Sequence, residues 1–151
     1  MGRRDFLIKQ LHEIRAELWF VLDRLDADFR IYPDWTKREF YAHISGWDAI
    51  VFDAFRSYRT GTRRRAFNYT DMDTVAYYFV SIRASLPLED AKLECEINGA
   101  AIVTWLDTFS DESIQEEVIF PWGAESVENW LIGAIDHERE HLADIRKKLV
   151  Q

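Results

Sequence analysis

Three of the four histidines stand where the side chains of two predicted helices could meet. His137 and His141 are four residues apart, which places both imidazoles on one helix face about one turn apart. His43 lies about midway along a second predicted helix and could approach from across a bundle. Imidazole nitrogens bind divalent ions at roughly 2.0–2.1 Å. The three residues are therefore candidate ligands of one metal ion.

Three neutral imidazoles would leave at least one coordination position open to water or substrate. Structural zinc sites are usually closed by four protein ligands, often cysteines, and the single cysteine here, Cys95, cannot provide such a set. Open three-ligand sites are typical of metals that lower the pKa of a bound water or polarise a substrate. The alternative interpretation is that the histidines are hydrogen-bonded core residues without a metal.

The segment from His137 to His141 also matches H-E-x-x-H and the reversed form H-x-x-E-H, which mark zinc peptidases. Zinc peptidases of the first kind take a third ligand from further downstream. Only ten residues follow His141, and Asp144 is the single acid among them, so we do not expect a peptidase. Glu138 is a candidate general base, but a solvated helix charge is the simpler interpretation.

Composition and the spacing of apolar residues predict one all-α domain over residues 1–151. Hydrophobic residues make up 48% of the chain, enough for a sizeable core, and six glycines with three prolines suit long helices. Residues 5–26 repeat apolar side chains in a 4-3-4-3-4 pattern typical of a helix in a bundle. A capping box, Thr36 to Glu39, begins the second helix, and Gly61 is its expected end. The inward stripe of this helix is predicted to contain Phe40, His43, Ile44, Trp47, Ile50 or Val51, Ala54 and Tyr58.

The second half of the chain is expected to add a short helix and two long ones. Residues 62–72 read as a loop, followed by a short helix around 74–84, for which a strand is the alternative because the segment is rich in valine and tyrosine. A third long helix runs from Pro87 to about Phe109, and an acidic connection over 111–124 has an extended part near Val118. The last helix begins near the N-cap Ser126. The predicted faces are Ile97, Ala101, Trp105 and Thr108 in the third helix, and Trp130, Gly133 or Ala134, His137, His141 and Asp144 or Ile145 in the last.

The net charge of the chain disfavours some classes of binding partner. Nineteen basic and 27 acidic residues give a formal net charge of −8, which disfavours nucleic acid and anionic lipid as partners. Charges interrupt every apolar stretch before the ~18 residues of a membrane span, no signal-peptide core is present, and one cysteine suits a reducing compartment. We therefore expect a cytoplasmic protein. The basic run Arg63–Arg65 could attract an anionic ligand, although a solvated loop explains it more simply.

Two segments resemble a known family. Pro33-Asp34-Trp35-Thr36, leading into a helix with Ala42-His43-Ile44 and Trp47, is similar to the second helix of the DinB/YfiT-like superfamily. The segment from His137 to His141 resembles the final H-x-x-x-H helix of that family. The order, the separation and the total length agree across nearly the whole chain. The aromatic second helix and the segment before Pro87 resemble the ClbS/DfsB-type branch most.

The resemblance implies a four-helix bundle in DinB-like topology with a long crossover, often as a homodimer. It also implies a divalent metal, commonly zinc, nickel or iron, held by residues that map onto His43, His137 and His141. Members with known reactions include thiol transferases, an isomerase and a hydrolase that protects against a genotoxin. We therefore expect a metal-dependent enzyme acting on a small electrophilic or thiol-conjugated substrate, with a low-molecular-weight thiol as a possible co-substrate. The alternative is a non-catalytic protein that sequesters a small reactive compound.

Five further residues are candidate neighbours of the site or lie close to it in the sequence. Trp47 follows His43 by one turn and could line a metal pocket, but it could equally be core. Glu94 and Asn98 on the third long helix could reach the site, whereas Asp48 lies off the predicted stripe and is expected to be structural or exposed. Cys95 is expected to be a small buried residue rather than a nucleophile.

Overall fold

The computed structural model describes residues 1–62 and 71–151. Within these ranges the helices are α1 (Arg3–Leu22), α2 (Lys37–Thr60), α3 (Met72–Ser81), α4 (Leu88–Leu106) and α5 (Val127–Leu149), with a short 3-10 helix η1 (Ser113–Gln115). An antiparallel hairpin of β1 (Glu117–Phe120) and β2 (Gly123–Ser126) precedes α5. None of the described helices contains a stretch long and apolar enough to cross a membrane.

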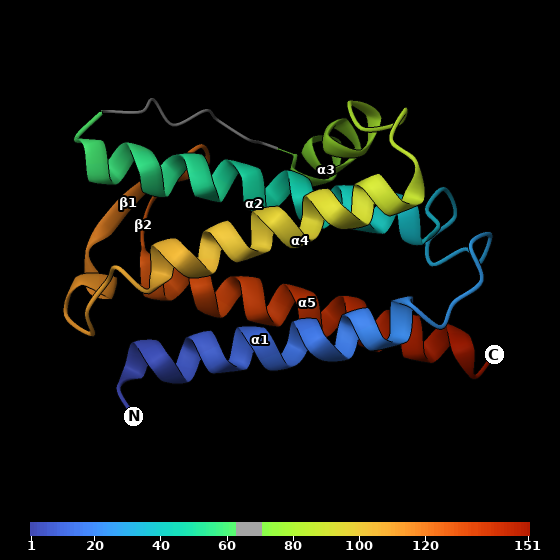
Figure 1. The fold of residues 1–151 in the computed structure, drawn as a ribbon, viewed down its shortest axis with the longest axis horizontal. Coiled ribbons are helices and arrows are strands. Elements are labelled where there is room, and N and C mark those ends of the chain that lie inside the picture. The colour runs from blue at the N-terminus through green and yellow to red at the C-terminus, as the bar shows by residue number, and fades with distance from the viewer. Residues whose placement is uncertain (63–70) are drawn as a thin grey trace.

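The four long helices form a bundle with a crossover. α1 and α5 lie side by side and run in one direction, whereas α2 and α4 pack against each other and run in the opposite direction (Figure 1). Because α2 and α4 are parallel, the chain returns along the bundle between them, and α3 lies on this return and packs against α2. The all-α bundle, the crossover and the short helix are confirmed, although α3 begins and ends slightly earlier than the predicted 74–84.

The first helix ends at Leu22, four residues before its predicted end at residue 26. The amides of Arg24 and Leu25 each donate to a carbonyl three residues earlier, at 3.1 Å, so the chain tightens into a turn. Lys37 Nζ then donates to the Leu25 carbonyl at 2.8 Å. Leu25 is nevertheless buried, because it enters the core from the turn rather than from the helix. Its apolar spacing therefore predicted its burial correctly and its conformation wrongly.

The second helix begins where the capping box places it. The Glu39 carboxylate accepts from the backbone amide and the hydroxyl of Thr36, at 2.8 and 2.5 Å. Gly61 has φ 69°, a left-handed conformation that glycine adopts at low cost, and it ends the helix. This register leaves His43 only 3% exposed.

The inward faces of the last two long helices differ from the predicted ones. α4 ends at Leu106 rather than Phe109, and its predicted stripe is wrong because Ile97 is 59% exposed. The residues of α4 that are buried are Ala91, Cys95, Ile102 and Leu106. In α5 Trp130 and Ile145 are buried as predicted, whereas Leu131, Ile135, Glu138 and Leu142 each lie one position later than the predicted residue. His137 and His141 therefore border the core and face toward α2.

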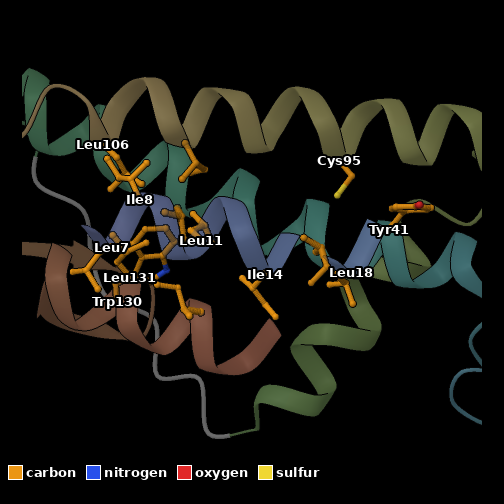
Figure 2. Close-up of a cluster of buried hydrophobic side chains, with 14 of the residues drawn as sticks. Leu7, Ile8, Leu11, Ile14, Leu18, Tyr41, Cys95, Leu106, Trp130 and Leu131 are labelled. Atoms are coloured by element: carbon orange, nitrogen blue, oxygen red, sulfur yellow. The ribbon is translucent and has the colours of Figure 1, made fainter. Parts of the chain in front are cut away.

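One hydrophobic core joins the four long helices. Leu11 and Leu18 of α1 are fully buried in a cluster with Cys95 of α4 and Leu131 of α5 (Figure 2). Burial raises the pKa of the Cys95 thiol, so the thiolate form is disfavoured. Cys95 is a core residue, as expected.

A buried charge network ties α1, α2 and α5 together. Arg15 Nη1 and Nη2 donate to the two carboxylate oxygens of Asp48 at 2.8 and 2.9 Å. Arg15 Nη2 and Nε donate to Glu138 at 2.7 and 2.9 Å. Gly99 of α4 leaves room for this arrangement, since a Cβ atom there would lie 2.9 Å from Arg15 Nη1. The three side chains are only 12%, 4% and 3% exposed.

The network also positions the histidines. Glu138 directly follows His137, and Asp48 lies on α2 five residues after His43. Both carboxylates bind the same guanidinium, so the two helices that carry these histidines are held to one register. The interpretation of Glu138 as a solvated helix charge is wrong, because its position on the core stripe of α5 buries it against Arg15.

We expect Arg15→Met to lower the free energy of unfolding by about 3–5 kcal/mol, because two buried carboxylates would lose their counter-ion. Combining it with Asp48→Asn and Glu138→Gln should reduce this loss, since no charge then remains buried. Chemical denaturation measures both. As a control, Arg146→Met removes an exposed ion pair with Glu17 and should change stability by about 1 kcal/mol or less. Equal losses in the two single variants would contradict the assignment.

Candidate metal centre

The structure brings His43, His137 and His141 together between α2 and α5. Nε2 of His43 lies 3.1 Å from Nε2 of His141, which lies 2.9 Å from Nε2 of His137. One ligand atom from each residue lies within 4.8 Å of the others. Two nitrogens bound to a tetrahedral ion at roughly 2.0–2.1 Å are about 3.4 Å apart, so a small outward movement of the rings would admit an ion. The three histidines could therefore hold a metal ion.

Burial keeps the three imidazoles neutral. Burial, and then the neighbouring His141 and His137, holds the pKa of His43 well below its usual value. Burial also lowers the pKa of His137, and burial together with His137 lowers the pKa of His141 to about 4. The neutral imidazole is the form that binds a metal. Near neutral pH the protein therefore presents three ligands without first releasing protons from them.

Tyr32, in the loop before α2, orients His141. The Tyr32 hydroxyl donates to Asp144 Oδ2 at 2.9 Å and lies 2.6 Å from Nδ1 of His141. Because its proton points to Asp144, the hydroxyl oxygen can accept from the Nδ1–H of His141, which leaves the Nε2 lone pair directed at the other histidines. Burial, followed by the bond to Asp144, raises the pKa of Tyr32 and keeps the hydroxyl protonated. Partners of this kind set the tautomer of metal-binding histidines.

Aromatic rings close the histidine cluster on the side of this loop. The ring centroid of Trp35 lies 4.8 Å from that of His43, and Phe40 contacts His141 edge-on at 5.0 Å. The turn that carries Tyr32 and Trp35 is held by the Trp35 amide, which donates to the Tyr32 carbonyl at 3.1 Å. Nδ1 of His43 is buried and has no hydrogen-bond partner among the described residues. The polar contact of this ring is therefore at Nε2, toward the other two histidines.

A cavity of about 390 Å³ lies beside the cluster. His43 and His137 line it, whereas His141, Trp35 and Phe40 do not, so a small molecule in this space would reach a metal ion held by the histidines. Its size is that of a small-molecule site. The walls come from α1, α2, α3, α5, β2 and the turn between β1 and β2. Besides the charged residues described below, they include Ile44, Trp47, Val51, Met72, Asp73, Ala76, Trp122, Glu125, Asn129, Trp130 and Ala134. A Cβ atom at Gly46 would overlap Phe79 of α3, so glycine at this position allows α3 to approach and form its wall.

The inner wall of the cavity is charged but internally paired. Both carboxylate oxygens of Glu138 accept from Arg15. Burial raises the pKa of Glu138, and Arg15 partly offsets this rise. Burial acts to lower the pKa of Arg15, but Asp48 and Glu138 outweigh it and raise that pKa well above its ordinary value. Glu138 is thus engaged in the network, which argues against its use as a general base.

The other residues that the sequence suggested as neighbours of the site lie in different parts of the structure. Trp47 lines the cavity. Asn98 donates to Ser45 Oγ at 2.9 Å, and Glu94 pairs with Arg83 at 2.9 Å, so both are engaged away from the histidines. The Arg63–Arg65 run lies outside the described residues. Nothing in the sequence pattern pointed to Tyr32 or Arg15.

The comparisons with known proteins concern the fold. No protein-family model matches the sequence, and no curated protein matches it at a significant level. Among solved structures, DfsB, described as a sibling lethal factor precursor, has a TM-score of 0.78 and 20% identity, over 95% of this chain and 93% of its own. Uncharacterised proteins from Clostridium difficile (TM-score 0.80, 17% identity, 97% and 95% covered) and Escherichia coli (0.78, 14%, 97% and 92%) are also similar. At such identities the likeness shows the fold alone. The chain therefore has the DinB-like helical fold of DfsB, as its resemblance to the ClbS/DfsB-type branch predicted.

Proposed function

We propose that the protein is a divalent-metal-dependent enzyme that acts on a small electrophilic or thiol-conjugated substrate. Its metal ligands are His43, His137 and His141. The observation that carries the proposal is that three neutral imidazoles direct Nε2 at one point, at the inner end of a cavity of small-molecule size. Zinc, nickel and iron are the candidate ions, because imidazole ligands suit all three.

When bound, such an ion supplies Lewis acidity, which lowers the pKa of a water or a low-molecular-weight thiol or polarises a substrate. The residues around it have distinct tasks. Tyr32 and Asp144 hold His141 in the tautomer that exposes Nε2. Trp35 and Phe40 cover the histidines away from the cavity, so substrate enters from the cavity side.

The alternative is a non-catalytic protein that sequesters a reactive compound in the same cavity. The observation that favours it is the pairing of Asp48 and Glu138 with Arg15. Neither of these two inner carboxylates is free to accept a proton from a substrate. An enzyme in this cavity would thus depend on its metal and on groups of the substrate itself.

The proposed partner is a small molecule rather than nucleic acid or a membrane, in keeping with the net charge of −8. We also propose a cytoplasmic location, since the single cysteine is buried and unpaired. A homodimer stays a prediction from the family resemblance.

Elemental analysis tests the metal site directly. Protein purified without chelators or a nickel affinity column should contain about one divalent ion per chain. His43→Ala, His137→Ala and His141→Ala should each lose most of it, because two remaining imidazoles bind an ion much more weakly. His12→Ala is the matched control, since His12 is the one other histidine and is exposed on α1.

Two results would contradict this assignment. Stoichiometric metal that persists in all three ligand variants would place the ion elsewhere. Protein that is metal-free and takes up no added zinc, nickel or iron would show that the imidazoles hydrogen-bond to one another instead.

Tyr32→Phe tests the orienting role of the hydroxyl. We expect its metal affinity to fall by about 10–100-fold, as for other residues that orient a ligand, while the ring keeps its contacts with Trp35 and His141. Competition with a metal indicator measures the dissociation constant. Tyr58→Phe removes a hydroxyl bonded to Glu116 and should leave the affinity unchanged. Equal affinities of Tyr32→Phe and the parent protein would remove Tyr32 from the site.

Turnover assays separate the two enzyme types from the binding alternative. The metal-loaded protein should convert a model electrophile, chlorodinitrobenzene, only with an added thiol if it is a transferase, or hydrolyse a nitrophenyl ester without thiol if it is a hydrolase. His137→Ala should abolish either activity. A fully metal-loaded protein that is inert in both assays, and with a wider panel of electrophiles, would favour sequestration.

A further inference from the structure

The charges and rings around the cavity indicate the class of molecule that it takes. We propose that the cavity beside the histidines binds an organic cation with an apolar body, and that its cationic group lies beside Asp73 and Glu125. This inference rests on the proposed function, because it describes the substrate of the same site.

Besides the neutral His43 and His137, the described lining residues contain four acids and one base. The base, Arg15, already pairs with two of the acids, Asp48 and Glu138, so its charge is balanced before any ligand enters. The other two acids, Asp73 of α3 and Glu125 of β2, lie farther out, where Asp73 is exposed to solvent. The cationic group of a ligand is attracted to these two carboxylates and an anionic group is repelled by them, since the described lining residues contain no unpaired Lys or Arg.

The aromatic walls add a second preference for a cation. The indole rings of Trp47 and Trp122 meet at 68° with centroids 5.8 Å apart and form one corner of the cavity. Trp122 stacks on Phe120 at 5.0 Å, and its Nε1 donates to Glu125 at 2.8 Å. An indole and a carboxylate are thus held together in one wall. Indole faces attract ammonium groups more strongly than other aromatic rings do.

The inference also constrains the thiol of the proposed reaction. A thiol that carries several carboxylates would have to pass Asp73 and Glu125 without a compensating base among the described lining residues. A neutral or amine-bearing thiol meets no such repulsion. These two carboxylates therefore disfavour carboxylate groups on a thiol co-substrate, whereas a metal ion at the histidines would attract its sulfur.

Three probes of similar shape test the charge preference. Benzyltrimethylammonium keeps its charge at every pH and cannot coordinate a metal. Neopentylbenzene is its uncharged counterpart, and benzylsulfonate is an anion of similar size. Titration calorimetry on the folded, full-length protein should show the cation binding about 10-fold tighter than either other probe, as expected from an aromatic wall with nearby carboxylates.

Variants of Asp73 and Glu125 test where the cationic group of the ligand lies. Asp73→Asn with Glu125→Gln should weaken binding of the ammonium probe by about 3–10-fold, the range of one or two exposed charge interactions, and should leave neopentylbenzene binding unchanged. Gln at position 125 keeps an oxygen for the Trp122 indole, so the change removes charge rather than the wall. Asp28→Asn, an exposed acid in the loop between α1 and α2, is the control and should bind all probes as the parent does.

The outcomes for this inference and for the metal site are separable. The inference would be overturned if benzylsulfonate bound as tightly as the ammonium probe or more tightly, or if the Asp73→Asn/Glu125→Gln variant kept the ammonium affinity of the parent. Either result would count even if the protein holds one metal ion per chain. Conversely, a preference for the ammonium probe that is lost when Asp73 and Glu125 are substituted would support the inference, even in metal-free His43→Ala protein. If the parent protein also holds no metal, the same ammonium preference would exclude the proposed metal-dependent enzyme and would still support the cation site.

Discussion

The packing of this bundle depends on one constraint, the burial of the Arg15 guanidinium between two carboxylates. Removing a charge from water is tolerated only where opposite charges and hydrogen bonds replace the solvent. α1 provides the cation, and α2 and α5 provide Asp48 and Glu138. Rotation of either of these two helices by one residue would leave a carboxylate buried and unpaired. The network therefore selects one register for the helices that carry His43 and His137, which apolar side chains alone would define less sharply.

Local rules made the histidine cluster predictable. The four-residue spacing places His137 and His141 on one face of any helix, whatever the rest of the chain does. The capping box at Thr36 sets the start of α2, and counting from it turns His43 inward. The meeting of the two helices is not local, and there the family resemblance added what the spacing lacked. The structure brings the three rings together as predicted, and whether they hold a metal ion is a matter for elemental analysis.

The residues that sequence patterns missed owe their roles to contacts between distant segments. Tyr32 lies in a loop, and its distance to His141 depends on how that loop folds over the bundle. Glu138 did carry a signal, because it occupies a core position in the apolar series Leu131, Ile135, Leu142 and Ile145. A charge in such a series is normally unfavourable, which indicates a buried partner. The face of α4 was also predicted wrongly, since the apolar Ile97 was placed inward. Ile97 is exposed, and its polar neighbour Asn98 donates to Ser45 of α2.

The site divides between the four long helices and the shorter elements that connect them. The candidate metal ligands come from α2 and α5. Asp73 comes from α3, and Trp122 and Glu125 come from the hairpin region before α5. The long helices thus position the three histidines, and the shorter elements supply the two unpaired carboxylates and one of the indole rings of the cavity. Substitutions in α3 and the hairpin can then change the substrate preference while the histidines stay in place, because the Arg15 network joins α1, α2 and α5 without residues of either shorter element.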